Sequence, residues 1–202
     1  MGEMGTGRVE AFSDGVFAIA ITLLILEIRA PVHSPDLGQA LLDLWPSYLA
    51  YVTSFFSIGV MWVNHHAIFA RLGRTDHTLM FLNTLLLLVV AFIPFPTRLV
   101  AEYLRNGGSG ERTAALAYGC TGIVLAVFFQ ALWRYAATGR RLIRADVPQA
   151  AVDDITRTFT PGIALYAGAT AVAFGNALAS VSLFLALALF YALPPVWLRR
   201  NA

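Results

Sequence analysis

Residues 8–26 read RVEAFSDGVFAIAITLLIL, an apolar run whose first residues include an arginine, a serine and an aspartate. The run has close to the roughly 20 apolar residues that a helix needs to cross a bilayer. An ionised carboxylate at the end of a membrane helix is costly unless it faces water or meets a partner. Asp14 therefore predicts a polar partner elsewhere in the chain, or a position at water.

The whole chain has the composition of an integral membrane protein. Of its 202 residues, 58% are hydrophobic and 13% are charged, whereas soluble domains carry roughly 25% charged residues. The segments between the apolar runs are too short to fold separately, so we expect a single membrane domain over residues 1–202. The first run lacks a cleavage pattern and is interpreted as a retained helix, not a signal peptide. A net charge of +2, spread over loops, does not favour nucleic acid as a partner.

Six apolar runs predict an all-α membrane protein with six transmembrane helices. The runs cover residues 11–28, 45–68, 77–96, 114–135, 159–177 and 181–198, and turn-forming or charged residues separate them. Only residues 176–180 divide the last two runs, so one bent helix is the alternative there.

The arginines predict the orientation of these helices. Six spans place both termini on one side of the membrane, and the other side then holds four arginines, Arg29, Arg98, Arg105 and Arg112. The side of the termini holds the remaining ten: Arg8, Arg71, Arg74, Arg134, Arg140, Arg141, Arg144, Arg157, Arg199 and Arg200. Because positive charge accumulates on the cytoplasmic side, we expect both termini in the cytoplasm. Trp45 and Trp197 fit aromatic anchors at the two interfaces.

Three of the predicted helices bring polar side chains to the cytoplasmic end. These are Arg8, Ser13 and Asp14 on the first, Trp62, Asn64, His65 and His66 on the second, and Asp76, His77 and Asn83 on the third. A network among them would give Asp14 and Arg8 the partners that buried polar groups require. The alternative is that they only contact headgroups and water.

A metal centre is not expected in this cluster. His65 and His66 are adjacent, so on a helix their side chains diverge by about 100° and do not chelate one ion. The lone Cys120 lies in an apolar stretch and provides neither a disulfide nor a cysteine metal site.

Helical phase divides the first span into two faces. At about 100° per residue, Phe12, Thr22 and Leu26 fall within roughly 60° of Ile19. Ser13 and Asp14 fall about 120° and 220° away and point toward neighbouring helices. The Ile19 face is either a functional surface or an ordinary packing or lipid face, with the Thr22 hydroxyl bonded to its own helix.

Arg8, Phe12, Ser13 and Asp14 match the signature R-x-x-x-F-S-D, and the chain resembles the transmembrane protein 175 family of lysosomal potassium channels and their prokaryotic relatives. The signature lies at the start of the first of six spans, and the chain resembles the single-repeat bacterial type. The resemblance implies a potassium-selective leak channel in the plasma membrane of a prokaryote. It also implies a homotetramer in which four first helices line a central pore for K⁺, surrounded by membrane lipid and without a cofactor.

The resemblance also implies roles for individual residues. Ile19 would form the narrowest ring of a hydrophobic gate, with Thr22 one turn above it and Leu26 as a second apolar ring. The signature residues Arg8, Phe12, Ser13 and Asp14 would form a supporting network with the second and third helices. The candidates there are Trp62, Asn64, His65, His66 and His77.

Two other function classes are weighed against a channel. A proton-coupled secondary transporter would use Asp14 with one of the histidines, but the sequence shows neither an internal repeat nor paired broken helices. An enzyme is disfavoured, because the sequence contains no H-E-x-x-H, G-x-S-x-G or G-x-G-x-x-G motif. We therefore expect a channel.

Overall fold

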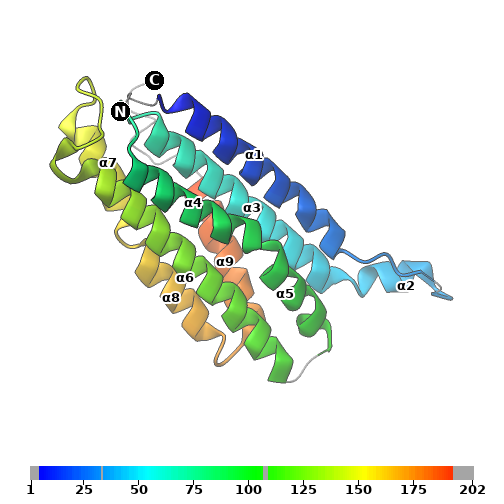
Figure 1. The fold of residues 1–202 in the computed structure, drawn as a ribbon. Helices are drawn as coiled ribbons and strands as arrows, with labels where there is room; N and C mark the ends of the chain where they lie inside the picture. The colour runs from blue at the N-terminus through cyan, green and yellow to red at the C-terminus, as the bar shows by residue number, and fades with distance from the viewer. Residues whose placement is uncertain (1–4, 33, 107–108, 193–202) are drawn as a thin grey trace, which may run out of the picture.

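The computed structural model describes residues 5–32, 34–106 and 109–192, and its regular elements over these ranges are helices (Figure 1). The first helix, α1 (Gly7–Leu23), continues as a 3₁₀ turn, η1 (Leu24–Glu27). The other elements are α2 (Leu37–Leu42), α3 (Trp45–Phe69), α4 (His77–Phe92), α5 (Pro94–Asn106), α6 (Ser109–Ala137), the 3₁₀ turn η2 (Thr138–Arg140), α7 (Gln149–Phe159), α8 (Gly162–Val172) and α9 (Ala177–Ala192).

Four of the helical segments in the described residues are long and apolar enough to cross a membrane. They are Gly7–Glu27, Leu37–Phe69, His77–Leu104 and Gly110–Arg140. Each contains most or all of one of the first four expected spans, so the prediction of an all-helical membrane protein is confirmed. The last helix, α9, is apolar but has only 16 residues.

The third expected span is interrupted near its end, at residue 93. α4 ends at Phe92 and α5 begins at Pro94, because proline has no amide hydrogen to continue the helical ladder. Ile93 between them keeps helical backbone angles, and its carbonyl accepts the Thr97 N–H at 3.1 Å. The expected end at residue 96 is wrong, since α5 continues to Asn106 and carries Arg98. Two further helices, α2 and α7, lie mostly in segments that were expected to be loops.

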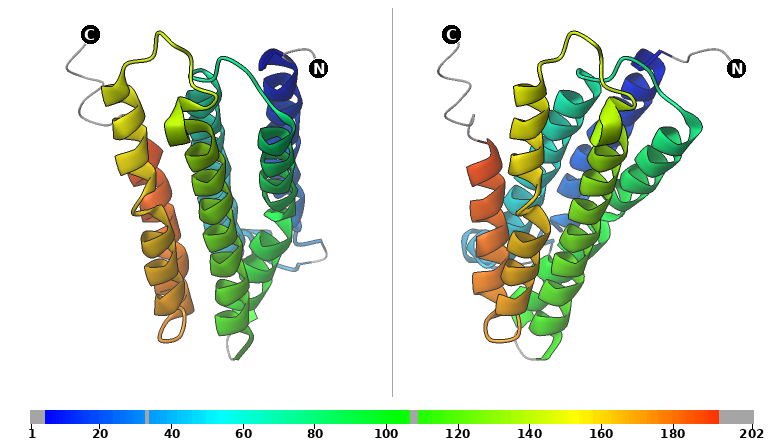
Figure 2. Two further views of the ribbon diagram at one scale, coloured as in Figure 1. Left: turned by 60° about the vertical axis from the view of Figure 1, so that its left-hand side comes forward. Right: turned by 90° about the vertical axis from the view of Figure 1, so that its left-hand side faces the viewer.

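The last two apolar runs form separate antiparallel helices. The fifth expected span, residues 159–177, contains the short helix α8 and the turn after it, and α7 precedes α8 end to end with a break at residues 160–161. A turn at residues 173–176 then reverses the chain, and α9 packs beside α8 (Figure 2). The alternative of one bent helix is therefore wrong. Trp197, Arg199 and Arg200 lie outside the described residues.

The α3–α4 and α6–α7 connections lie at the end of the bundle where α1 begins (Figure 2). They are joined to each other by backbone hydrogen bonds. Gly73 N–H donates to the Leu142 carbonyl at 2.9 Å, and Arg144 N–H donates to the Arg71 carbonyl at 3.0 Å. The two arginine-rich connections thus form one unit at this end of the molecule.

Asp76 anchors this unit to the start of α4. Its carboxylate accepts the Leu79 N–H at 2.8 Å and the Tyr135 hydroxyl at 2.7 Å. Burial raises the pKa of Asp76, but these two hydrogen bonds, together with nearby Arg141 and Arg74, outweigh it and hold the pKa below its ordinary value. Asp76 therefore both caps α4 and ties it to α6.

Two glycines allow α6 to approach α8 and α9 closely. A methyl group at Gly119 would overlap the side chain of Thr170, and one at Gly122 would lie 2.9 Å from the Tyr166 ring. Small residues permit this kind of contact between membrane helices.

We expect Gly119→Ala to destabilise the fold by about 1–3 kcal/mol, because the added methyl forces α6 and α8 apart. The matched control is Gly168→Ala on α8, where a methyl would meet nothing within 4 Å. Thermal unfolding in detergent measures both variants, and equal melting temperatures would contradict a close contact at Gly119.

Candidate functional site

The helix α1 lies at the edge of the bundle and packs against α3 and α4 (Figure 1). Only 22% of its membrane-spanning window is buried, whereas 39–44% is buried in the other three candidate spans. One face of α1 is therefore held by the rest of the chain, and another is left open.

The held face contains a chain of three buried polar side chains from α1, α3 and α4. The Ser13 hydroxyl donates to the Val9 carbonyl at 2.8 Å and accepts from Asn83 Nδ2 at 3.0 Å. Asn83 Oδ1 lies 2.8 Å from His65 Nε2. The exposed fractions of Ser13, Asn83 and His65 are 0%, 2% and 1%, so water does not compete for these bonds.

The direction of every hydrogen bond in this chain follows from the first. Because the Ser13 proton is given to Val9, the Ser13 oxygen accepts from the Asn83 amide nitrogen. The Asn83 oxygen then faces His65 and can only accept, so His65 Nε2 carries a proton.

Aromatic rings fix the His65 side chain. The Phe69 ring stacks on the imidazole with 4.3 Å between the ring centroids, and the Phe17 ring meets it edge-on at 5.4 Å. Phe17 comes from α1, so packing and hydrogen bonding both hold α1 against α3 at this level.

Asp14 has a separate partner. Its Oδ1 accepts the indole N–H of Trp62 at 2.9 Å, and the Trp62 ring stacks on His66 with centroids 6.4 Å apart. Asp14, Trp62 and His66 are exposed in the single chain. The carboxylate is thus paired by one charge-assisted hydrogen bond at the surface of the bundle.

The other proposed network residues lie apart from this cluster. The side chains of Arg8, Phe12 and His77 are exposed, and none of them forms a hydrogen bond or ion pair with a described residue. Asn64 lines a cavity of about 60 Å³ with residues of α6 to α9, away from Ser13.

Asn83 was named in the cytoplasmic polar cluster but not among the supporting residues that the resemblance implied, and the structure places it at the centre of the chain of hydrogen bonds. The available signal was an amide inside the apolar run LNTLLLLVV, seven residues after the helix cap Asp76.

The open face of α1 carries the residues that the sequence assigned to a pore. Phe12, Ile19 and Leu26 are 64%, 61% and 70% exposed. Thr22 is also exposed, and its hydroxyl donates to the carbonyls of Ala18 and Ile19 at 2.9 and 3.0 Å. Because the proton points back to the helix, the lone pairs of Thr22 Oγ1 are directed away from it.

The end of this face differs from the expected continuous α-helix. In η1 successive residues turn by about 120°, so the side chains after Leu24 depart from α-helical phase. Leu24 is buried, whereas Ile25 and Leu26 are 52% and 70% exposed and point about 120° apart.

No group of three or more His, Cys, Asp or Glu residues in the described part of the chain is arranged to hold a metal ion. The chemistry of the site is therefore that of hydrogen bonds, one carboxylate and an aliphatic surface.

We expect Asn83→Leu to lower the unfolding free energy by about 1–3 kcal/mol, because it leaves the buried His65 N–H without an acceptor. The triple variant Ser13→Ala, Asn83→Leu, His65→Phe removes every partner and should recover much of this loss. Thr84→Ala is the matched control, because Thr84 is exposed on the same helix and bonds only to Met80. Thermal unfolding measures all three variants. A triple variant less stable than Asn83→Leu would contradict the proposed role of the hydrogen bonds among Ser13, Asn83 and His65.

Comparison with known proteins identifies relatives of the whole chain. The family described as endosomal/lysosomal potassium channel TMEM175 matches residues 8–94. A potassium channel of Chamaesiphon minutus is 50% identical over 192 residues, covering 93% of this chain and 94% of the relative. A potassium channel of Streptomyces collinus is 47% identical over 190 residues, covering 92% of this chain and 91% of the relative.

A solved structure resembles the present one along its full length. It is the crystal structure of a lysosomal potassium-selective channel TMEM175 homolog from Chamaesiphon minutus, with a TM-score of 0.84 and 48% sequence identity. The alignment covers 98% of each chain.

Proposed function

The chain belongs to the TMEM175 family of potassium channels, and we propose that it conducts K⁺ through a central pore lined by α1 from four copies in a homotetramer. It is a channel and not an enzyme. The resemblance drawn from Arg8, Phe12, Ser13 and Asp14 is confirmed by these relatives.

One observation carries the placement of the pore. The open face of α1 has a line of large aliphatic side chains, while its other face is bonded to α3 and α4. A helix held this way presents the same residues in every copy. Four copies around one axis would enclose Ile19, Thr22 and Leu26.

A ring of Ile19 side chains supplies the gate. An ion does not shed its water into an aliphatic ring without large cost, so four close isoleucines exclude both water and ions. A modest rotation or splay of α1 would widen the ring and admit them. The Ile19 ring is the narrowest point in this proposal, and Leu26 forms a second apolar ring.

Thr22 supplies a weak cation-binding site beside this gate. Its hydroxyl proton is directed to Ala18 and Ile19, so its oxygen offers lone pairs to a cation. Four such oxygens replace part of the hydration shell of a cation and bind it weakly. Weak binding favours K⁺, because Na⁺ is more strongly hydrated.

The network residues hold α1 and do not contact the ion. The rotation of α1 about its axis is set by the hydrogen bonds among Ser13, Asn83 and His65. The hydrogen bond between Asp14, the next residue of α1, and Trp62 restrains the same rotation. Arg8 at the mouth would contact headgroups or a neighbouring copy.

We place this single six-helix domain in the plasma membrane of a prokaryote, with both termini cytoplasmic. The joined α3–α4 and α6–α7 connections carry Arg71, Arg74, Arg140, Arg141 and Arg144, and the positive-inside rule assigns them to the cytoplasm.

Ion flux and single-channel recording of the reconstituted protein, with opposed K⁺ and Na⁺ gradients, test the function itself. For a channel, we expect ohmic unitary currents that reverse near the K⁺ equilibrium potential. Saturable, proton-driven flux would instead support a transporter that uses Asp14 and a histidine.

Thiol modification tests Ile19. In a Cys120→Ala background, which removes the exposed native thiol, Ile19→Cys should be blocked by a thiol reagent, because a charged adduct fills the ring. Phe190→Cys on α9, at an equally exposed site of 67%, should be modified without block. An unchanged current after modification of Ile19→Cys would show that residue 19 does not line the pore.

Substitution of Asp14 tests the support role. We expect Asp14→Ala to reduce the yield of assembled tetramer before it alters selectivity, because the Trp62 N–H loses its acceptor. Asp14→Asn keeps an acceptor oxygen and should assemble better. Size-exclusion chromatography with reversal potentials measures both, and normal tetramers with an altered K⁺/Na⁺ ratio would contradict support.

A further inference from the structure

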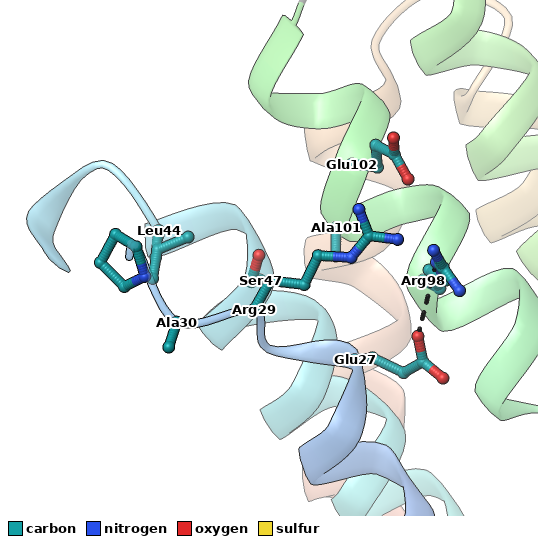
Figure 3. A pocket seen from close by; sticks show the side chains of 9 residues that line it. Glu27, Arg29, Ala30, Leu44, Ser47, Arg98, Ala101 and Glu102 are labelled. Atoms are coloured by element: carbon teal, nitrogen blue, oxygen red, sulfur yellow. Dashed lines mark ion pairs between the residues drawn. The ribbon is translucent and has the colours of Figure 1, made fainter. Parts of the chain in front are cut away.

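The exit of α1 is held by a contact that the pore proposal does not use. η1 ends at Glu27, directly after Leu26, and packs against α3 and α5. The Glu27 carboxylate lies 3.8 Å from Nε of Arg98 on α5 (Figure 3). Among the described residues, this is the only hydrogen bond or ion pair that joins residues 24–32 to α5.

The space around this ion pair is open. A cavity of about 260 Å³ lies between the η1 exit, the start of α3 and α5, and its lining includes Arg29, Ser47 and Glu102 (Figure 3). Side-chain packing therefore leaves part of the space between the exit of α1 and α5 unfilled. Where packing is incomplete, a charge pair has more influence on the position of the segment.

We propose that Glu27 and Arg98 are positioning residues for ion conduction, which set the place of the α1 exit and hence the width of the pore beside Leu26. This inference rests on the proposed function, because it assumes that α1 lines the pore. α5 is separated from α4 by the break at Ile93 and packs against α3 and α6. The pair thus ties the exit to the α3, α5 and α6 part of the fold.

The same cavity holds alternative partners for both charges. Arg29 forms no hydrogen bond or ion pair with a described residue, and Glu102 lines the cavity one turn along α5 from Arg98. In Figure 3 the Arg29 side chain extends toward Ala101 and Glu102, whereas Glu27 points to Arg98. A movement of the exit that brought Arg29 to Glu27 and left Glu102 to Arg98 would exchange the partners without leaving a charge unpaired. Such an exchange would give the exit a second charge-balanced position.

The expected effect of the pair is modest in each subunit and larger in the assembly. The side chains of Arg98 and Glu27 are 47% and 21% exposed, so solvent screens the attraction. A pair of this kind shifts an equilibrium by about twofold to fivefold. If four exits move together, even a twofold bias in each becomes about 16-fold in the whole channel.

Charge reversal tests the proposal in the full-length, reconstituted channel. Glu27→Arg and Arg98→Glu should each change the open probability by about tenfold or more, in the same direction. The double variant E27R/R98E should return to within about threefold of the unmodified channel, because it restores the attraction with the signs exchanged. Arg112→Glu, an exposed charge at the same end of the bundle, is the control and should behave as the unmodified channel.

A double variant no closer to the unmodified channel than its parents would overturn the proposal, as would single variants that match Arg112→Glu. If the reversed single variants do not assemble, the neutral variants Glu27→Gln and Arg98→Gln replace them. Impermeant salt at about 1 M on the Glu27 side screens charges beyond about 3 Å. It should therefore reproduce the Glu27→Gln effect in the unmodified channel and do nothing further to Glu27→Gln. The absence of any K⁺ current in the unmodified protein would instead refute the proposed function.

Discussion

A polar group buried in hydrocarbon must find its hydrogen bonds within the protein, and this constraint determines how α1 is held. Ser13, Asn83 and His65 come from three helices, and each has its bonding partner only in one arrangement of those helices. Rotating α1 by even one residue step would bury the serine against apolar neighbours and leave the Asn83 amide unpaired. The chain of bonds therefore specifies which residues of α1 remain outside the bundle.

The two ends of α1 are held by interactions of different character. Near its start, polar side chains with almost no exposure form a network closed to water. At its exit, a partly exposed ion pair spans an open cavity. Salt screens a buried network much less than an exposed ion pair. The helix thus has a rigid end and an adjustable one.

The sequence predicts the first four membrane helices and a polar partner for Asp14, because apolar length and the cost of Asp14 are local properties. It placed Ser13 and Asp14 on the face of α1 that meets other helices, and the structure gives Ser13 a partner there. It did not select Asn83 over Asn64 and His77, because the directions of side chains on α3 and α4 depend on how these helices pack. It also missed the break before Pro94 and the 3₁₀ turn, since an apolar run conceals both.

The 3₁₀ turn has a consequence for how the protein fits its membrane. α1 and η1 together have 21 residues, and a 3₁₀ residue rises by about 2.0 Å where an α-helical residue rises by about 1.5 Å. The combined segment is therefore about 33 Å long, only slightly more than the roughly 30 Å of bilayer hydrocarbon. A segment of this length still spans the hydrocarbon at a tilt of up to about 25°, and a larger tilt would draw one end into the lipid. The thickness of the surrounding bilayer thus limits the tilt of α1.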